Sequence, residues 1–365
     1  DLSPSFFMEK SHIVFSSSYS SKDFKIIQLE KDVEEAIENG ETVCIKGEKG
    51  EQCVLATNNK SYAVEKIDTS NTVLLSQTLG EGEMSVQGCC GTILELVNNP
   101  LDVHRVLSHI PDLADTTASP VDLDVLTQCC TYARGEIERC IQSCPYVVVD
   151  LENHYHQLEN REYYSLMMDM INKCILSGIT LSSFTLDQVV SVCDQIQPFI
   201  TKHLVAQLTD NEPGSQVLTV HKPKLVQLII RDIFVSVANN SDWLSQEELQ
   251  MRIDTLLPSE FDFDIESDYS CLRGVAIHEN RGITKGFRFV DKDNLAMKPE
   301  ARFRQLFEME SEWSQEDILP FIEDLDSYGY GKPGDLLLKY CREVTTEENG
   351  VTKKHYVLRR DRKSV

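Results

Sequence analysis

The sequence predicts an α+β protein with a small N-terminal β-barrel-type domain followed by tandem winged-helix units. Short β-branched or apolar runs crowd the first hundred residues, and from Pro100 onward each set of helices ends in a hairpin-like stretch. Turns are expected near Asn153, Gly214, Gly282 and Gly350, a spacing of about 60 to 70 residues that indicates repeated units. A chain of 365 residues is long enough for several domains, each with its own core.

The N-terminal domain is expected over residues 1–97. Residues 1–22 are Ser-rich and are interpreted as a flexible lead-in, and a short helix capped by Asp32 is expected next. The strand candidates are FKIIQLE, TVCIKG, QCVLAT, SYAVEKID, NTVLLSQ and GTILELVN, with DTSN interpreted as a bend before a buried strand. A sheet of such short strands must close into a barrel or have its edges covered, because open edges promote aggregation.

The remaining chain is divided by the recurring order of three helices and a hairpin, which is the pattern of a winged helix. The expected units are 98–160, 161–222 and 223–365, and the last region is interpreted as two units, 223–293 and 294–365.

Both tryptophans lie at matching places in the last two units, in DWLSQE and EWSQE. Each is followed by a Ser with an acidic residue three positions later, Ser245 with Glu248 and Ser314 with Asp317, which predicts two capping boxes. The alternative is coincidence, because capping boxes are common. Pro320 is expected to interrupt the helix that begins after Ser314.

Signals for a metal, a nucleotide or catalysis are weak. Cys140, Cys144, His154 and His156 are the nearest approach to a zinc set, but their spacing suits buried thiols and solvent-facing histidines better. The glycines of GYGKPGD match G-x-G-x-x-G without a preceding strand, so a loop between two helices is the better interpretation. We therefore expect no enzyme, no metal and no cofactor.

The twelve cysteines include no C-x-x-C pair, which favours a reduced intracellular protein. No run approaches the roughly 20 apolar residues that a membrane span needs. The opening DLSPSFFMEK also lacks the basic-then-apolar order of a signal peptide.

The net charge of −24 is unevenly distributed. Residues 273–365 hold 17 Lys and Arg and 17 Asp and Glu, whereas residues 1–272 hold 18 basic and 42 acidic residues. Asn349-Gly350 predicts a hairpin turn, and basic residues follow it, so the C-terminal end is either a phosphate-binding wing or a basic solubilising tail. Residues 359–363 are also a weak nuclear-import signal. The DNA-binding candidates are Lys332, Lys339, Arg342, Lys353, Lys354, His355, Arg359 and Arg360.

Several stretches together resemble one protein family. They are KGEKGEQCVLATNNKSYAVEKIDTSNTVLL, CLRGVAIHE, ARFRQLFEMESEWSQEDILPFIEDL and LLLKYCRE. They are similar to the family called defective in sister chromatid cohesion, a subunit of the alternative clamp loader in which the chromosome-transmission-fidelity large subunit replaces that of replication factor C. Between about residues 100 and 230 only the order of helices and hairpins matches.

The resemblance implies a non-enzymatic adaptor in the nucleus, on chromatin at replication forks. Its β region would complete a barrel with a small companion subunit and the large clamp-loader subunit. Its C-terminal array, three winged helices by the family's usual count, would contact DNA with low sequence specificity and the catalytic subunit of DNA polymerase epsilon. It would thereby support loading and unloading of PCNA. The partner-binding candidates are Val54, Leu55, Tyr62, Val64, Asp68, Thr69, Ser70, Asn71, Val73, Leu74 and Leu75.

The leading alternative is a sequence-specific transcription regulator that uses one winged helix. It would need base-reading side chains on a recognition helix, and GDLLLKYCRE offers only Lys339 and Arg342. The surface that contacts the polymerase is not assigned by the sequence.

Overall fold

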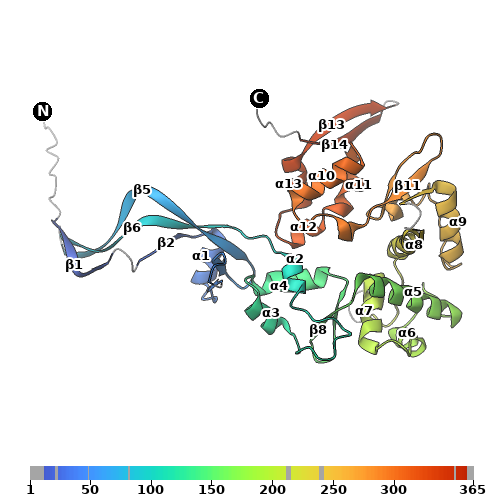
Figure 1. Cartoon of the computed structure of the whole chain (residues 1–365), viewed down its shortest axis with the longest axis horizontal. Coiled ribbons are helices and arrows are strands. Elements are labelled where there is room, and N and C mark those ends of the chain that lie inside the picture. Colours follow the sequence, from blue (N-terminus) through green and yellow to red (C-terminus); the bar gives the residue numbers. More distant parts are fainter. Residues whose placement is uncertain are drawn as a thin grey trace. The chain divides into compact units, whose positions relative to one another are not determined.

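A computed structural model describes residues 12–20, 24–47, 49–80, 83–210, 215–237, 242–348 and 351–359. Its contacts divide the described residues into two compact units. The first contains the chain up to Asn99 together with Thr131–Glu136, and the second contains Pro100–Cys130 and everything from Ile137 onward (Figure 1).

The first unit is built around a six-stranded sheet with the order β1-β6-β5-β4-β3, and β2 also pairs with β6. The elements of this unit are β1 (His12–Ser20), β2 (Ile26–Gln28), α1 (Lys31–Glu38), β3 (Cys44–Lys46), β4 (Val54–Ala56), β5 (Ser61–Gly80) and β6 (Glu83–Asn98). Strands β3 and β1 lie at opposite ends of this order, so the described strands form an open sheet and no closed barrel. The described part of this chain therefore closes no barrel by itself, and a barrel shared with partner subunits stays a prediction.

Strands β5 and β6 form a long antiparallel hairpin, which carries β1 along β6 near its far end (Figure 1). The stretch interpreted as two strands around a DTSN bend is one strand of 20 residues. The pairing shifts there, from Asp68 opposite Thr92 to Val73 opposite Cys90, so DTSN lies in a β-bulge. The Thr69 hydroxyl donates to the carbonyl oxygens of Asn71 (2.6 Å) and Gly91 (3.2 Å), which stabilises the bulge.

A small hydrophobic core lies where α1 covers the base of this sheet. Its buried members are Val33, Leu55, Tyr62 and Leu96. The Asp32 side chain accepts a hydrogen bond from the Tyr62 hydroxyl. The predicted cap at Asp32 is wrong, because α1 begins two residues earlier than such a cap requires and Glu30 is its N-cap.

The second unit consists of short helices that alternate with small hairpins. Its helices are α2 (Val103–Leu107), α3 (Leu123–Cys129), α4 (Arg134–Ser143), which starts in the first unit, α5 (Asn160–Leu176), α6 (Leu186–Val192), α7 (Pro198–Leu208), α8 (Lys222–Val237), α9 (Gln246–Leu256), α10 (Pro299–Met309), α11 (Gln315–Ile318), α12 (Asp324–Ser327) and α13 (Pro333–Tyr340). Short 3-10 helices are η1 (Tyr269–Leu272), η2 (Lys292–Asn294) and η3 (Leu319–Phe321).

Three small sheets follow or join these helices. Their strands are β7 (Val147–Val149), β8 (Tyr155–Gln157), β9 (Trp243–Ser245), β10 (Ala276–His278), β11 (Gly286–Phe289), β12 (Trp313–Ser314), β13 (Cys341–Glu348) and β14 (Val351–Leu358). Strands β7 and β8 pair with each other, and the other two sheets have the orders β10-β11-β9 and β12-β14-β13. Among the described residues, no helix has the length and apolar character that a membrane crossing requires.

The expected turns have different outcomes. Asn153 and Gly282 have positive φ angles in the β7–β8 and β10–β11 hairpins, as predicted. The turns expected at Gly214 and Gly350 lie outside the described residues. Around the former, the structure has only isolated bridges, Phe184 with Leu218 and Thr209 with Val220.

Only the serine half of each predicted capping box forms, because the Glu248 side chain bonds to Arg252 and the Asp317 side chain to Ser314 Oγ and Arg273. Ser245 Oγ accepts from the Glu248 N–H (3.2 Å), and Ser314 Oγ accepts from the Asp317 N–H (3.1 Å). Helix α11 ends at Ile318, and Pro320 lies in η3, so the interruption by proline is confirmed. Trp313 is buried in the core of the last set of elements, with Phe303, Leu306 and Phe321.

Candidate interaction surfaces

The outer part of strand β5 has one unpaired edge among the described strands. β4 pairs only with residues 61–63 of β5, whereas β6 pairs with β5 along nearly its whole length. Residues from Glu65 to Leu79 therefore present backbone N–H and C=O groups that no described strand covers. Such an edge can accept a further strand by backbone hydrogen bonding.

The partner-binding candidates divide into two sets along this hairpin. Leu55 and Tyr62 are buried in the local core with Val33 of α1, so their side chains cannot contact another chain while α1 stays in place, and Val54 is buried too. Val64 is half-buried against the same core, whereas Asp68, Ser70, Asn71, Val73 and Leu74 are exposed and Thr69 and Leu75 are half-buried. The candidates up to Val64 thus belong to the core of the first unit, whereas most of those from Asp68 to Leu75 are exposed and available to a partner.

The outer hairpin exposes more apolar side chain than a sheet in water usually does. Leu74 is 49% exposed and Leu79 is 58% exposed. Strand β1 adds Ile13 at 56% and Phe15 at 65%. Several exposed apolar side chains on one hairpin and its neighbouring strand favour an interaction surface.

Strand β1 was missed by the sequence interpretation, which took residues 1–22 as a flexible lead-in. The signal was present in HIVF, where β-branched and aromatic residues follow one another, but the serines that follow obscured it. Phe24, just before β2, packs against Gly88 of β6, where a Cβ would collide with the Phe24 ring.

The DNA-binding candidates lie around the β13–β14 hairpin and α13. Tyr356 and Leu358 of β14 pack against the core, so the alternate residues His355 and Arg359 face outward. Arg342 is directly opposite Val357 and shares this outer face. Lys332 and Lys339 are exposed at the start and in the last turn of α13. The side chain of Lys353 and all of Arg360 lie outside what the structure describes.

Some of these cations already interact with protein groups, which makes them less available to a phosphate. Lys354 lies on the opposite face of the strand and forms an ion pair with Glu343 at 2.9 Å, and the hydrogen bond to Glu343 raises the pKa of Lys354. Arg359 Nε donates to the Cys341 carbonyl (2.8 Å), and Lys339 Nζ is 5.1 Å from the centre of the Tyr340 ring. Among the described residues, Arg342 has no ion-pair partner, which leaves its guanidinium available.

Arg304, which was not among the candidates, lies close to these cations in the folded protein. Arg304 of α10 lines one hollow with Arg342 and Arg359, although Glu308 and Glu312 line it too. Sequence reasoning missed Arg304 because it lies 38 positions before Arg342. Its only signal was a position on the exposed face of an amphipathic helix.

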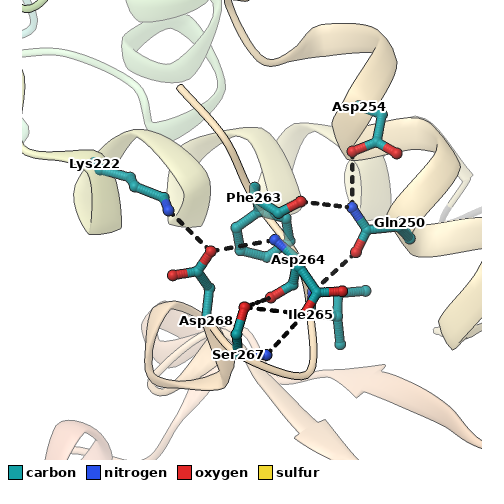
Figure 2. A network of polar contacts seen from close by, with 8 residues as sticks. All are labelled: Lys222, Gln250, Asp254, Phe263, Asp264, Ile265, Ser267 and Asp268. Atoms are coloured by element: carbon teal, nitrogen blue, oxygen red, sulfur yellow. Dashed lines mark hydrogen bonds and ion pairs between the residues drawn. The ribbon is translucent and has the colours of Figure 1, made fainter. Parts of the chain in front are cut away.

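The β9–β11 set of elements has an acidic segment in the place where the last set has α13. Residues 258–268 precede the short η1 and include Glu260, Asp262, Asp264, Glu266 and Asp268. Figure 2 shows how this segment is held. The two ends of the Gln250 amide bond to the Ile265 N–H (2.9 Å) and the Phe263 carbonyl (3.0 Å), and Lys222 bonds to Asp268 (2.9 Å). The segment is ordered and negative, which disfavours contact with phosphates.

The candidate zinc residues do not form a site. Cys140 and Cys144 are buried free thiols, and burial raises the pKa of Cys140 to about 12. His154 and His156 contact Asp150 instead. Among the described residues, no group of three or more His, Cys, Asp or Glu side chains could hold a metal ion.

The fold and these surfaces together define a class: an α+β protein with an open, edge-exposing sheet and a series of helix–hairpin sets. The family model for the sister chromatid cohesion protein Dcc1 matches residues 24–322, most of the chain. The chain belongs to the Dcc1 family of sister chromatid cohesion proteins, as its resemblance predicts.

Several relatives are similar to this chain over nearly its whole length. The protein named "Probable sister chromatid cohesion protein DCC1" of Dictyostelium discoideum is 23% identical, over 92% of this chain and 94% of its own. The protein named "Sister chromatid cohesion protein DCC1" is 22% identical in Saccharomyces cerevisiae (80% of this chain, 84% of its own) and 22% identical in Homo sapiens (92% and 88%).

Proposed function

We propose that this chain is a non-enzymatic adaptor subunit of an alternative clamp loader and acts in sister chromatid cohesion and DNA replication. Membership of the Dcc1 family supports the role in cohesion, because the relatives are named for it. The observation that carries the adaptor role is the β5–β6 hairpin, which combines an uncovered backbone edge with exposed apolar side chains.

Partner subunits bind by adding strands to this hairpin. Backbone hydrogen bonds across the new pairs supply affinity, and alternate side chains such as Val73 select the partner. The added strands cover Leu74 and Leu79 and complete with this sheet the barrel that the chain does not close by itself. The partners are the chromosome-transmission-fidelity large subunit and its small companion subunit.

The helix–hairpin sets of the second unit act as tandem winged helices. Support comes from the last set, whose order is helix, short strand, helices and a two-stranded hairpin, with the short strand β12 paired to β14. The set from α8 to β11 has the same order, with η1 in place of its third helix.

DNA binds at the last of these sets and without strong sequence preference. The exposed face of α13 carries Leu338, which is 69% exposed, beside Lys339 and Asp335, so it offers few groups that could read base edges. Arg342 and Arg359 on the hairpin are suited to phosphates. The acidic segment 258–268 makes the preceding set a poor DNA contact.

The same array contacts the catalytic subunit of DNA polymerase epsilon, and the complex acts on PCNA at replication forks in the nucleus. The resemblance of the sequence supports these partners and this location.

Affinity purification with a paired control tests the adaptor role. Val73→Lys/Leu74→Lys places two charges on the hairpin surface, and Met251→Lys places one on an exposed apolar position of α9. The first variant should lose the clamp-loader subunits that co-purify with the wild-type chain, and the second should keep them. Retention of the subunits by both variants would contradict binding through this hairpin.

Measuring affinity for several unrelated duplexes distinguishes the adaptor from a sequence-specific transcription regulator. We expect equal affinities that fall steeply with salt. A preference for one sequence by a thousandfold or more, on the order found for specific regulators, would favour the regulator.

A further inference from the structure

The second unit contains a cavity of about 500 Å³ that the proposed adaptor function does not use. It is lined by residues from six separate parts of the sequence, and Tyr146, Tyr164, Arg231, Lys292 and Tyr328 are among them. Its size is within the range of pockets that bind small molecules.

Two of the three carboxylates that line this cavity, Asp293 and Asp324, are hydrogen-bonded to protein groups, and the third, Glu323, lies 3.6 Å from Lys292 Nζ. Asp293 Oδ2 accepts from the Tyr146 hydroxyl, from Asn160 Nδ2 (3.3 Å) and from Arg231 Nη2 (2.5 Å). Both oxygens of Asp324 accept from Arg302 Nη1 at 2.7 Å. These acceptors are therefore engaged before any ligand arrives.

The donors, in contrast, are in surplus. Arg231 Nε is buried and has no hydrogen-bond acceptor, although the side chain is only 12% exposed and its guanidinium lies 4.1 Å from the centre of the Tyr164 ring. Lys292 Nζ is 3.6 Å from Glu323 and 3.8 Å from Asp324, beyond hydrogen-bond length. The Tyr328 hydroxyl has no partner among the described residues, and burial raises the pKa of this phenol, which keeps it a donor.

Unsatisfied buried donors are costly, and an anion with several oxygens can satisfy them together. Arginine, lysine and tyrosine are also the side chains that commonly bind phosphate oxygens. We propose that this cavity binds a tetrahedral oxyanion, either free phosphate or the phosphate group of a small phosphomonoester, through Lys292 and Tyr328.

Calorimetric titration of the full chain tests the site, with inorganic phosphate and glycerol phosphate as probes and chloride at equal ionic strength as the reference. We expect a dissociation constant of about 1 mM or below for at least one probe. Tighter binding of the free ion would indicate phosphate itself as the ligand, and tighter binding of the ester would indicate a phosphomonoester.

Three variants locate the binding. Lys292→Gln and Tyr328→Phe each remove one donor and should weaken binding by about ten- to a hundredfold, the effect of one charge-assisted hydrogen bond. Lys298→Gln makes the same charge change on a nearby exposed residue outside the cavity and should leave binding unchanged. Thermal unfolding without ligand shows whether each variant is folded. If one of the two donor variants is destabilised, the binding measured for the other donor variant tests the proposal.

Two results would overturn the proposal. One is the lack of any phosphate-dependent heat up to about 10 mM, far above the expected dissociation constant. The other is unchanged binding in both Lys292→Gln and Tyr328→Phe. Neither result bears on the adaptor role, because the β5–β6 hairpin contributes no residue to the cavity.

Discussion

The ion pair between Lys354 and Glu343 predicts that removal of an acidic residue strengthens DNA binding. The Lys354 ammonium is 2.9 Å from Glu343, and both side chains are substantially exposed. An exposed pair of this kind is weak because water screens it, but Lys354 must give it up before it binds a phosphate. Glu343→Gln should therefore tighten DNA binding about two- to fivefold.

Arg342→Ala provides the opposite perturbation on the same hairpin. If four cations, Lys332, Lys339, Arg342 and Arg359, each contact one phosphate of a duplex, log K falls with log salt at a slope of about −3.6. Affinity then drops about 150-fold between 50 and 200 mM salt, and about 40-fold once Arg342 is removed. Lys354→Ala should weaken binding less than Arg342→Ala, because its charge is already partly satisfied by Glu343.

Fluorescence anisotropy with a labelled duplex over this salt range measures both effects. Circular dichroism of each variant confirms that the hairpin still folds. Unchanged or weaker binding by Glu343→Gln, together with an unchanged salt slope for Arg342→Ala, would refute the placement of DNA on this hairpin.

Three further predictions concern individual contacts. Arg302 is 1% exposed and bonded to Asp324, so Asp324→Leu should destabilise the last helix–hairpin set by about 3–5 kcal/mol. The double variant Arg302→Leu/Asp324→Leu should lose less stability, because no unpaired charge is left buried. Hydrogen exchange over residues 299–340 measures both losses, and equal losses would contradict this prediction. Burial raises the pKa of Asp150, but hydrogen bonds from His156 and the backbone outweigh the effect of burial and lower the pKa to about 2. The carboxylate therefore stabilises the β7–β8 hairpin above about pH 4, and this stabilisation disappears as the pH falls towards 2. Asp150→Asn should therefore speed exchange of residues 147–157 at pH 7 and converge with wild type near pH 2; a constant difference would be unexpected. Thr69→Val removes two hydrogen bonds in the bulge and should weaken subunit binding, whereas Thr69→Ser should not, as pull-down assays can show.

Local sequence signals predicted the local structure well. The serine caps at Ser245 and Ser314, the break at Pro320 and the turn at Gly282 depend on hydrogen bonds or backbone angles within a few residues. Each can be inferred from a short stretch because the physical cause lies within that stretch. The family resemblance was likewise carried by contiguous stretches near both ends of the chain.

Features that depend on distant neighbours were predicted less well. DTSN reads locally as a bend, but pairing with β6 keeps it within one strand as a bulge. The candidates Leu55 and Tyr62 have the same pattern as exposed strand residues, and only packing with Val33 of α1 makes them core. Arg304 approaches Arg342 only once α10 packs beside the hairpin, so no local signal could include it.

Hydrogen exchange of the β5 edge tests directly whether partner subunits bind by strand addition. In the isolated chain, the amides of residues 65–79 that face away from β6 have no described partner strand and should exchange rapidly. In the complex isolated with its co-purifying subunits, the same amides should be slowed by about a hundredfold or more, as new backbone hydrogen bonds form. Equal exchange rates in the isolated chain and in the complex would contradict strand addition at this hairpin.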